Sequence, residues 1–438
     1  MNRRLALWTG LGVLLAARVA SAQDVTIGYQ GLPYKASGES NTGIQVSDGL
    51  LLHSGIGVEA GYDTNVFYAP PGPPIGPPIG STIVRVMPYL ELTNATRTGP
   101  VSREVTFDAR AGLQYRYYGS DNPEVVRYRN AWMPNAGLSL GFGGGQQFGF
   151  GVADVFARTE DAPYQTQLLT VNNPLTHSNN QASIEARWSP GGGRLTSVLR
   201  FTNMVDVYDA PYTYANDMVN TLMLDVAWKW LPKTAIFFNA QQGYIDYFNN
   251  STTMDPVTGT TVPAKVSSYP LSVTAGLRGL LTSKTSALFA LGYTNGFYSG
   301  GHTTGGFLGS SYAKLEVAVQ LTQLSRAVVG VQHSFANAVI SSFSYNEMAY
   351  ASYVQQIAGR LALDLSGRYQ YIAYQGTFVD SAEAGRVDNN FMVGASLDYF
   401  LRNWAYVGVG YSLQDNNSNF AADDYLKQQI FARLGITY

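Results

Sequence analysis

The chain contains no cysteine, so neither disulfide bonds nor thiolate metal sites can hold it together. Charged residues make up only 13% of it, against about 25% in soluble proteins. After Gln23 no segment reaches about 18 consecutive uncharged apolar residues, which excludes a membrane-spanning helix from the rest of the chain. Any insertion of this chain into a membrane must therefore use strands.

The first 22 residues predict a cleaved secretory signal peptide. Arg3 and Arg4 precede an apolar stretch at 5–17, and small residues at 20–22 place the cleavage site before Gln23. About a dozen apolar residues are too few to cross a bilayer. Removal of three arginines from the 28 basic residues leaves 25 against 30 acidic ones, which argues against nucleic acid as a partner.

Alternation of apolar and polar residues is the main structural signal. In 105–117, valine, phenylalanine, alanine, leucine and tyrosine occupy the odd positions, while Thr106, Asp108, Arg110, Gln114 and Arg116 occupy even ones. A strand places two such sets on opposite faces, whereas a helix would scatter both. The pattern recurs along the chain and predicts strands at 55–67, 82–94, 103–117, 128–142, 146–158, 177–189, 194–208, 216–230, 233–248, 269–282, 285–298, 309–322, 326–341, 345–357, 360–374, 387–400, 404–415 and 424–437.

The fold class that follows is all-β: a transmembrane antiparallel up-and-down β-barrel of about eighteen strands, with sixteen as the alternative. Tight connections such as 143–145 and 402–403 alternate with long ones such as 159–176 and 249–268. Short periplasmic turns and long extracellular loops give this rhythm in barrels of the outer membrane of Gram-negative bacteria. We therefore predict that location, with outer-membrane lipid around the barrel.

The chain ends on an alternating strand with a terminal aromatic residue, Tyr438. This ending resembles the signal by which the barrel assembly machinery recognises its substrates, so that machinery is an expected partner. Trp188, Trp230 and Trp404 lie close to tight turns, where indoles can form the periplasmic aromatic girdle.

Three segments are expected: a signal peptide at 1–22, a periplasmic or lumenal segment at 23–50, and the barrel at 51–438. One strand conflicts with this scheme. In 146–158, Asp154 shares the parity of Phe148, Phe150 and Phe156, which would point a carboxylate at lipid. A β-bulge that shifts the register or a contact with another protomer would resolve the conflict.

Parity along the strands also selects residues that face the lumen. The candidates are Glu59, Arg85, Tyr89, Glu91, Asp108, Arg110, Gln114, Arg116, Glu185, Arg187, Arg200, Asp206, Asp225, Lys229, Arg278, Lys314, Glu316, Asp364, Arg368 and Asp398. With Glu104 and Arg433 included, ten acids oppose ten bases. Because lumenal charge sets pore selectivity, this balance favours a neutral or weakly charged cargo. Alternatively, such charges pair across the wall, as Asp225 could with Lys229 and Lys314 with Glu316.

Catalysis, cofactors and metals have little support. Of the four histidines only His333 adjoins a serine, and neighbours on a strand face opposite sides. Asp415, Asp423 and Asp424 near an outer loop fall short of a calcium-ligand set. We expect no enzymatic activity, no cofactor and no metal site.

The opening of the first strand, Gly61-Tyr62-Asp63-Thr64-Asn65-Val66-Phe67, resembles the start of β-barrel porins that accompany exopolysaccharide export systems in Gram-negative bacteria. The resemblance implies passage of a polysaccharide across the outer membrane together with a periplasmic export component. No 34-residue helical repeat precedes the barrel, so that component would be a separate protein. Hydroxyl-matching and ring-stacking candidates are Tyr89, Tyr208, Gln114, Gln320 and Gln370.

Three functions therefore remain open. The first is a polysaccharide-export channel. The second is a general or solute-specific diffusion porin, although no loop shows the clustered acids facing arginines that mark such pores. The third is a structural or adhesive barrel whose lumen is plugged by residues 23–50.

Overall fold

The computed structural model describes residues 43–47, 50–71, 77–94, 105–144, 146–161, 175–210, 212–249, 252–254, 261–263, 265–298, 310–338, 340–378 and 383–438. Eighteen strands among these residues form one closed antiparallel barrel. They are β2 (Leu50–Asp63), β3 (Ser81–Thr93), β4 (Val105–Gly119), β5 (Ala131–Phe142), β6 (Phe148–Asp161), β7 (Leu175–Trp188), β8 (Leu195–Tyr208), β9 (Asp217–Leu231), β10 (Thr234–Tyr247), β13 (Leu271–Leu280), β14 (Thr285–Asn295), β15 (Ser311–Thr322), β16 (Ser325–Asn337), β17 (Ser341–Ile357), β18 (Leu361–Phe378), β19 (Val387–Arg402), β20 (Ala405–Ser418) and β21 (Tyr425–Thr437).

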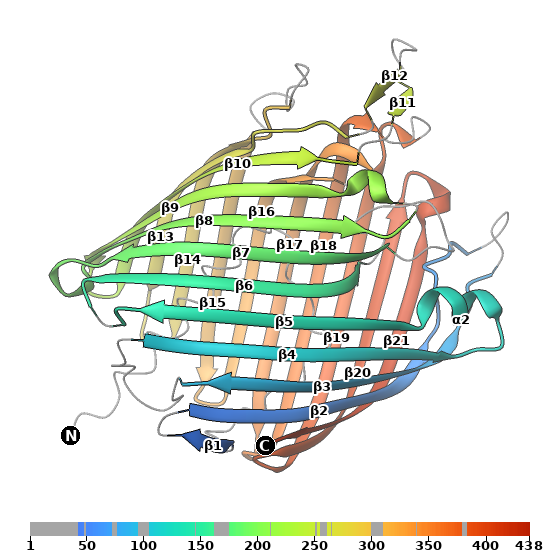
Figure 1. Ribbon diagram of the computed structural model, residues 1–438, viewed down its shortest axis with the longest axis horizontal. Coiled ribbons are helices and arrows are strands. Elements are labelled where there is room, and N and C mark those ends of the chain that lie inside the picture. The colour runs from blue at the N-terminus through green and yellow to red at the C-terminus, as the bar shows by residue number, and fades with distance from the viewer. Residues whose placement is uncertain are drawn as a thin grey trace.

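Each strand pairs with the next along the chain, and β21 pairs with β2 to close the barrel. The closing seam runs from Gly55 opposite Thr437 to Asp63 opposite Gln429. Figure 1 shows the front strands β2 to β9 crossing the back strands at a steep angle, as tilted strands do in a barrel. The predicted fold class and the count of eighteen strands are confirmed.

The start of β2 and the C-terminal residue meet at the edge where the tight turns lie. The Ser54 and Tyr438 backbones exchange hydrogen bonds there. A short strand, β1 (Ile44–Ser47), pairs with Leu50–Leu52 of β2 beyond the end of β21, and so extends the wall. The barrel itself begins at Leu50, one residue before the predicted boundary. Residues 1–22, with the predicted signal peptide, and most of 23–50 lie outside the described residues.

The long loops at the opposite edge contain five short elements: α2 (Pro123–Arg129), η2 (Thr213–Ala215), β11 (Thr252–Met254), β12 (Thr261–Pro263) and η4 (Ala421–Asp423). A further short helix, η1 (Gly191–Gly193), lies in a tight turn. Among the described residues, no helix is long and apolar enough to cross a membrane.

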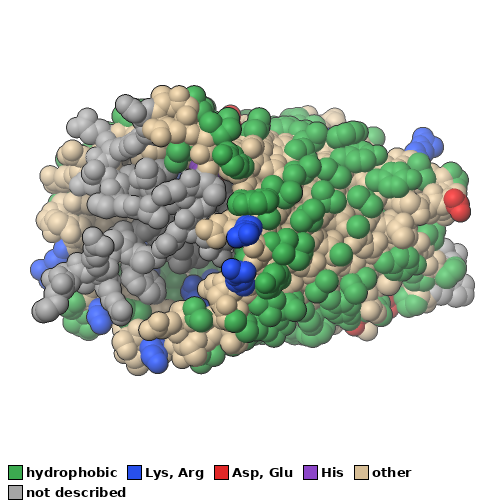
Figure 2. Space-filling view, turned by 90° about the horizontal axis from the view of Figure 1, so that it is seen from below, with side chains coloured by type: hydrophobic (Ala, Val, Ile, Leu, Met, Phe, Trp, Pro, Cys, Tyr) green, Lys and Arg blue, Asp and Glu red, His purple; other side chains and the backbone are tan. Residues whose placement is uncertain are grey.

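The outer surface of the barrel is apolar. Along β3, buried residues alternate with residues that turn outward, such as Val84 and Leu90. Figure 2 shows a broad band of hydrophobic side chains on one face, with few charged side chains within it. Trp188, Trp230 and Trp404 are exposed beside the tight turns. A closed barrel with this surface is an outer-membrane type of structure.

Asp154 lies on this outer face. No register shift interrupts the pairing of β6 with β5 or β7, so the proposed β-bulge was wrong. The carboxylate is exposed and accepts a hydrogen bond from Asn180 Nδ2 at 3.0 Å. This bond satisfies part of its hydrogen-bonding capacity but does not remove the cost of a charge among lipid chains. A contact with another protomer remains a prediction.

Replacing Asp154 with leucine should stabilise an isolated barrel in lipid vesicles by about 1–2 kcal/mol, because an acid on the lipid face is unfavourable. Urea titration of the folded protein, followed by tryptophan fluorescence, measures this change. Asp209→Leu, at an exposed position in the outer loops, is the control and should change stability by less than about 1 kcal/mol. A lower stability of Asp154→Leu would contradict exposure to lipid and favour the protomer contact.

Candidate functional site

The lumen is the candidate site, and its wall carries ion pairs, most of which join different strands. Arg85 NH1 lies 3.1 Å from Glu59 Oε2, Arg200 NH2 lies 2.6 Å from Glu185 Oε2, and Lys314 Nζ lies 3.3 Å from Glu316 Oε2. Three further pairs are Arg433 with Asp398, Arg116 with Glu160, and His177 with Asp206. Half of the eighteen charged candidates therefore belong to an ion pair on the wall.

Four of the lumenal cations also cover aromatic rings that lie over glycines. The clearest case is Gly61, which faces Phe431 across the seam, while Arg85 lies 4.5 Å above the phenylalanine ring. A Cβ on Gly61 would sit 2.7 Å from Phe431 Cδ1, so only glycine lets the ring lie this close to the wall. The same order of glycine, ring and cation occurs in Gly55–Tyr89–Arg110, Gly276–Phe237–Arg278 and Gly330–Tyr350–Lys314.

These stacks hold bulky side chains flat against the wall instead of letting them project into the lumen. They also change the interpretation of two sugar-stacking candidates. Tyr89 is 5% exposed, between Gly55 and Arg110. Tyr208 is 9% exposed and stacks on His177 with ring centroids 4.7 Å apart. Neither ring has a free face for a sugar, so both serve to pack the wall.

The remaining candidates have varied surroundings. Gln114 donates to Met133 Sδ, Arg368 to Met392 Sδ, and Arg187 to Ser189 Oγ. Glu91 and Asp108 lie on neighbouring strands near Arg110. Among the described residues, no side-chain hydrogen bond or ion pair was found for Asp225, Lys229 or Asp364, so the predicted pairing of Asp225 with Lys229 is absent. Glu104 lies outside the described residues.

The outer mouth is narrowed by loops that fold into the barrel. Val66 and Phe67 of the first outer loop and Val125 of α2 form one buried cluster with Ile83, Tyr118 and Phe431. The last three residues belong to the inward faces of β3, β4 and β21, as the burial alternation shows. The first two outer connections therefore pack against the lumenal side of the wall, next to the seam.

A buried lysine fastens the first of these loops. Lys427 Nζ lies 2.7 Å from Asp63 Oδ2, and both side chains are almost fully buried. The same ammonium group donates to Asn65 O at 2.8 Å and lies 4.0 Å from the centre of the Tyr68 ring. Since Asp63 is on β2 and Lys427 on β21, this contact also ties the closing seam together.

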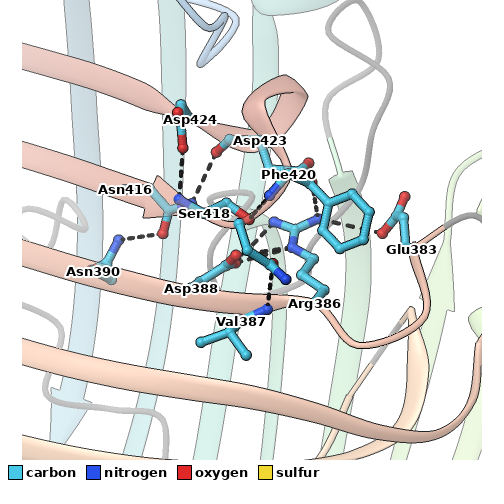
Figure 3. Close-up of polar contacts among 11 residues, drawn as sticks. Glu383, Arg386, Val387, Asp388, Asn390, Asn416, Ser418, Phe420, Asp423 and Asp424 are labelled. Carbon is cyan, nitrogen blue, oxygen red and sulfur yellow. Dashed lines mark hydrogen bonds and ion pairs between the residues drawn. The ribbon is translucent and has the colours of Figure 1, made fainter.

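A second fastening surrounds Arg386, which precedes β19 (Figure 3). Its guanidinium pairs with both carboxylate oxygens of Asp388, with Nε 3.0 Å from Oδ1 and NH2 2.9 Å from Oδ2. Its NH1 lies 2.8 Å from Asp423 Oδ2 and 3.4 Å from Glu383 Oε2. Three carboxylates thus share one cation that is 2% exposed. We call these four residues the arginine cluster.

The arginine cluster is a set of acids around an arginine, an arrangement that no single loop shows in the sequence. Its members are paired and buried, so it fixes two outer connections rather than lining an opening. Asp424 is also used locally, since Oδ1 accepts from the Ser418 backbone N–H at 2.6 Å. Among the described residues there is no group of three or more residues that could hold a metal ion.

Because the arginine cluster holds three carboxylates and one cation, we expect the stability of the folded protein to depend on pH. Burial raises the pKa of Asp423 to about 6, although Arg386 acts in the opposite direction. The folded state thus binds this proton more tightly than the unfolded chain, in which the pKa is about 3.9. The stability contribution of Asp423 is therefore greatest below about pH 4 and decreases as the pH rises through 6.

Asp423→Asn should consequently raise the free energy of unfolding at pH 7.5 by on the order of 2 kcal/mol, and change it little at pH 4. Urea titrations of wild type and variant at the two pH values measure the difference. Asp209→Asn, in an exposed ion pair with Arg158, is the control and should show no comparable pH-dependent gain. A loss of stability in Asp423→Asn at pH 7.5 would contradict the prediction.

A third contact between outer connections is made by Lys265, which follows β12 and reaches the connection between β16 and β17. Lys265 is buried and donates to Ser341 O at 2.9 Å and to Ala338 O. Its ammonium group also lies 5.0 Å from the centre of the Tyr247 ring. Burial lowers the pKa of Lys265 to about 7, so its charge changes near neutral pH. The sequence carried no signal for this contact, because its partners are backbone carbonyls more than 70 residues away.

The histidines occupy separate places. His333 and Glu347 form an ion pair on the outer face, whereas Ser334 is buried, so the two neighbours face opposite sides as expected. His177 Nδ1 lies 2.8 Å from Asp206 Oδ1 on the lumenal wall, a pair that parity alone did not single out.

No protein-family model matches this chain, and no curated protein matches its sequence. Solved structures with some likeness are outer-membrane proteins. The siderophore receptor PirA from Pseudomonas aeruginosa has a TM-score of 0.43 at 9% identity, over 88% of this chain and 80% of that one. OmpT of Vibrio cholerae has a TM-score of 0.35 at 10% identity, over 91% of this chain and all of that one. At these scores the likeness carries no argument about function.

Proposed function

We propose that this barrel is an outer-membrane channel through which a polysaccharide leaves the cell. The observation that carries the proposal is the construction of the lumenal wall. Strand spacing and tilt give eighteen strands a mean backbone diameter of about 35 Å. Within it, the glycine, ring and cation stacks keep large side chains flat against the wall. A wide lumen lined by polar groups suits a hydrated glycan chain.

The partners in this proposal follow from the sequence. A separate periplasmic export component would deliver the polysaccharide, the barrel assembly machinery would recognise the terminal strand, and outer-membrane lipid would surround the apolar band. We propose no catalytic role and no cofactor. The His177 and Asp206 pair then has a structural role, since His177 packs against Tyr208.

Deletion of the gene in its own bacterium tests the proposal. Surface polysaccharide should be lost from the cells and should return when the wild-type gene is restored. The control is a deletion strain that expresses the Gly61→Val variant, whose seam should not close and which should not restore secretion. Normal surface polysaccharide in the deletion strain would refute an export role.

A diffusion porin is the second candidate, and the inward-folded outer loops favour it. The first two outer connections pack against the lumenal side of the wall, and the arginine cluster and Lys265 fasten other outer connections to one another. A diffusion porin would let small sugars into liposomes at a rate that falls with their size. A swelling rate equal to that of protein-free liposomes would exclude this candidate.

A further inference from the structure

Exposed basic residues recur along the periplasmic edge, and seven of them follow one another along one arc from β7 to β16, while Arg360 and Arg402 lie at the next two tight turns. Four of them belong to strands and lie within about two residues of the tight-turn end: Arg187 on β7, Lys229 on β9, Arg278 on β13 and Arg326 on β16. The turns of the same arc add Arg194, Lys233 and Lys284. All seven side chains are exposed. We call these seven residues the basic arc.

The strand members of the basic arc face the lumen. Lys229 and Arg278 lie in one register row, on either side of Ala235. Their neighbours with outward parity are Trp228, Trp230 and Leu277, all exposed on the lipid side. Arg187 likewise alternates with the outward Trp188. Arg326 opposes Val354, whereas the next residue, Tyr353, pairs with Leu365, which is exposed on the lipid side. Because the apolar and aromatic residues occupy the lipid side, these bases cannot serve mainly as anchors to lipid headgroups.

The basic arc carries uncompensated charge. Among the described residues, none of its members has a carboxylate within ion-pair distance, and none of the described residues in the tight turns is acidic. The acids on these strands and on the intervening β15 lie farther into the barrel: Glu185 is paired with Arg200, Glu316 of β15 with Lys314, and Asp225 is about four residues above Lys229. The balance of ten acids and ten bases over the whole lumen therefore conceals an excess of positive charge along this part of its periplasmic entrance, between β7 and β16.

We infer that the basic arc receives an anionic polysaccharide, one that bears carboxylate, phosphate or sulfate groups, as it enters the channel from the periplasm. This inference rests on the proposed function and replaces the neutral cargo favoured by the lumenal charge count. Arginine and lysine rings at a pore entrance raise the local concentration of anions and select them over cations. The flexible lysines and exposed arginines can follow a moving polymer without a fixed binding pocket.

Planar bilayers test the inference with the whole purified barrel. Oligogalacturonate, a carboxylated probe, and dextran oligomers of equal length would be added on the tight-turn side. The oligogalacturonate should block the current at concentrations at least about ten times lower than dextran, with an advantage that shrinks as salt is raised. The double variant Arg187→Gln/Lys229→Gln should lose most of that advantage, and its pore should become less selective for anions.

The matched control is Arg127→Gln/Arg158→Gln, which removes two basic residues at the long-loop edge and should leave the block unchanged. Equal block by the two probes, or an unchanged advantage in the Arg187→Gln/Lys229→Gln variant, would overturn the inference. Neither result bears on the deletion test, so the proposal of an export channel would then stand for a neutral polysaccharide. Binding of acidic peptides without block by oligogalacturonate would instead assign the basic arc to a protein partner and would also overturn it.

Discussion

Replacement of Arg386 by methionine is expected to lower the free energy of unfolding by about 3–5 kcal/mol. The guanidinium is buried and is the cation shared by Asp388, Asp423 and Glu383. Methionine fills a similar volume but supplies no charge, so three carboxylates would remain close together with little access to water. Guanidinium titration of the folded barrel in detergent, followed by tryptophan fluorescence, measures the loss.

Arg158→Met is the matched control for this prediction. Arg158 also pairs with a carboxylate at the outer edge, that of Asp209, but their side chains are 31% and 47% exposed. Exposed ion pairs contribute about 0–1 kcal/mol, so this variant should unfold almost like wild type. Equal losses in the two variants would show that the arginine cluster does not fasten the outer connections. A second readout is single-channel current, which should become noisier only in Arg386→Met as the loops loosen.

Replacement of Gly61 by alanine is expected to destabilise the barrel by about 3 kcal/mol or more, because it overpacks the closing seam. A Cβ at this position would lie 1.9 Å from the Ile430 carbonyl oxygen of β21 and 2.7 Å from the Phe431 ring. Because this carbonyl is part of the backbone, the clash can be removed only if β2 and β21 move apart. Gly61→Ala should reduce the fraction of protein that migrates as the compact folded form in unheated gel electrophoresis.

Gly367→Ala is the control for the seam. Gly367 also lies within a strand, but the nearest heavy atom to a Cβ at this position would be Met392 O at 3.9 Å, an ordinary contact. This variant should fold to the wild-type extent. If both variants fold equally well, the close approach of β2 to β21 does not limit closure.

Local patterns determined the strands. In β4, apolar and polar residues alternate because one face meets lipid and the other meets the lumen, and this period of two is visible along the chain. Tight turns such as the one after Leu231 could be located because few residues can connect antiparallel strands so closely. The same parity assigned Glu59 and Arg85 to one face, where they form an ion pair.

Contacts between distant segments could not be found in this way. Arg386 and Asp423 are 37 positions apart, and Lys427 meets Asp63 only because β21 returns to β2. Parity gives the side of the wall on which a residue lies but not its distance from the periplasmic edge, so the basic arc was invisible in a count of ten against ten. For Asp154, in contrast, parity was sufficient: it predicts the lipid side, and the pairing of β6 has no register shift that would turn the side chain inward.

The sequence by itself determined that this chain is a barrel of eighteen strands, because burial between lipid and lumen imposes a period that each strand carries in its own residues. Only the tertiary structure decided how the outer mouth is fastened and where the positive charge lies along the axis. Both depend on the register between strands and on the closure of β21 against β2, which bring together residues that no local pattern connects.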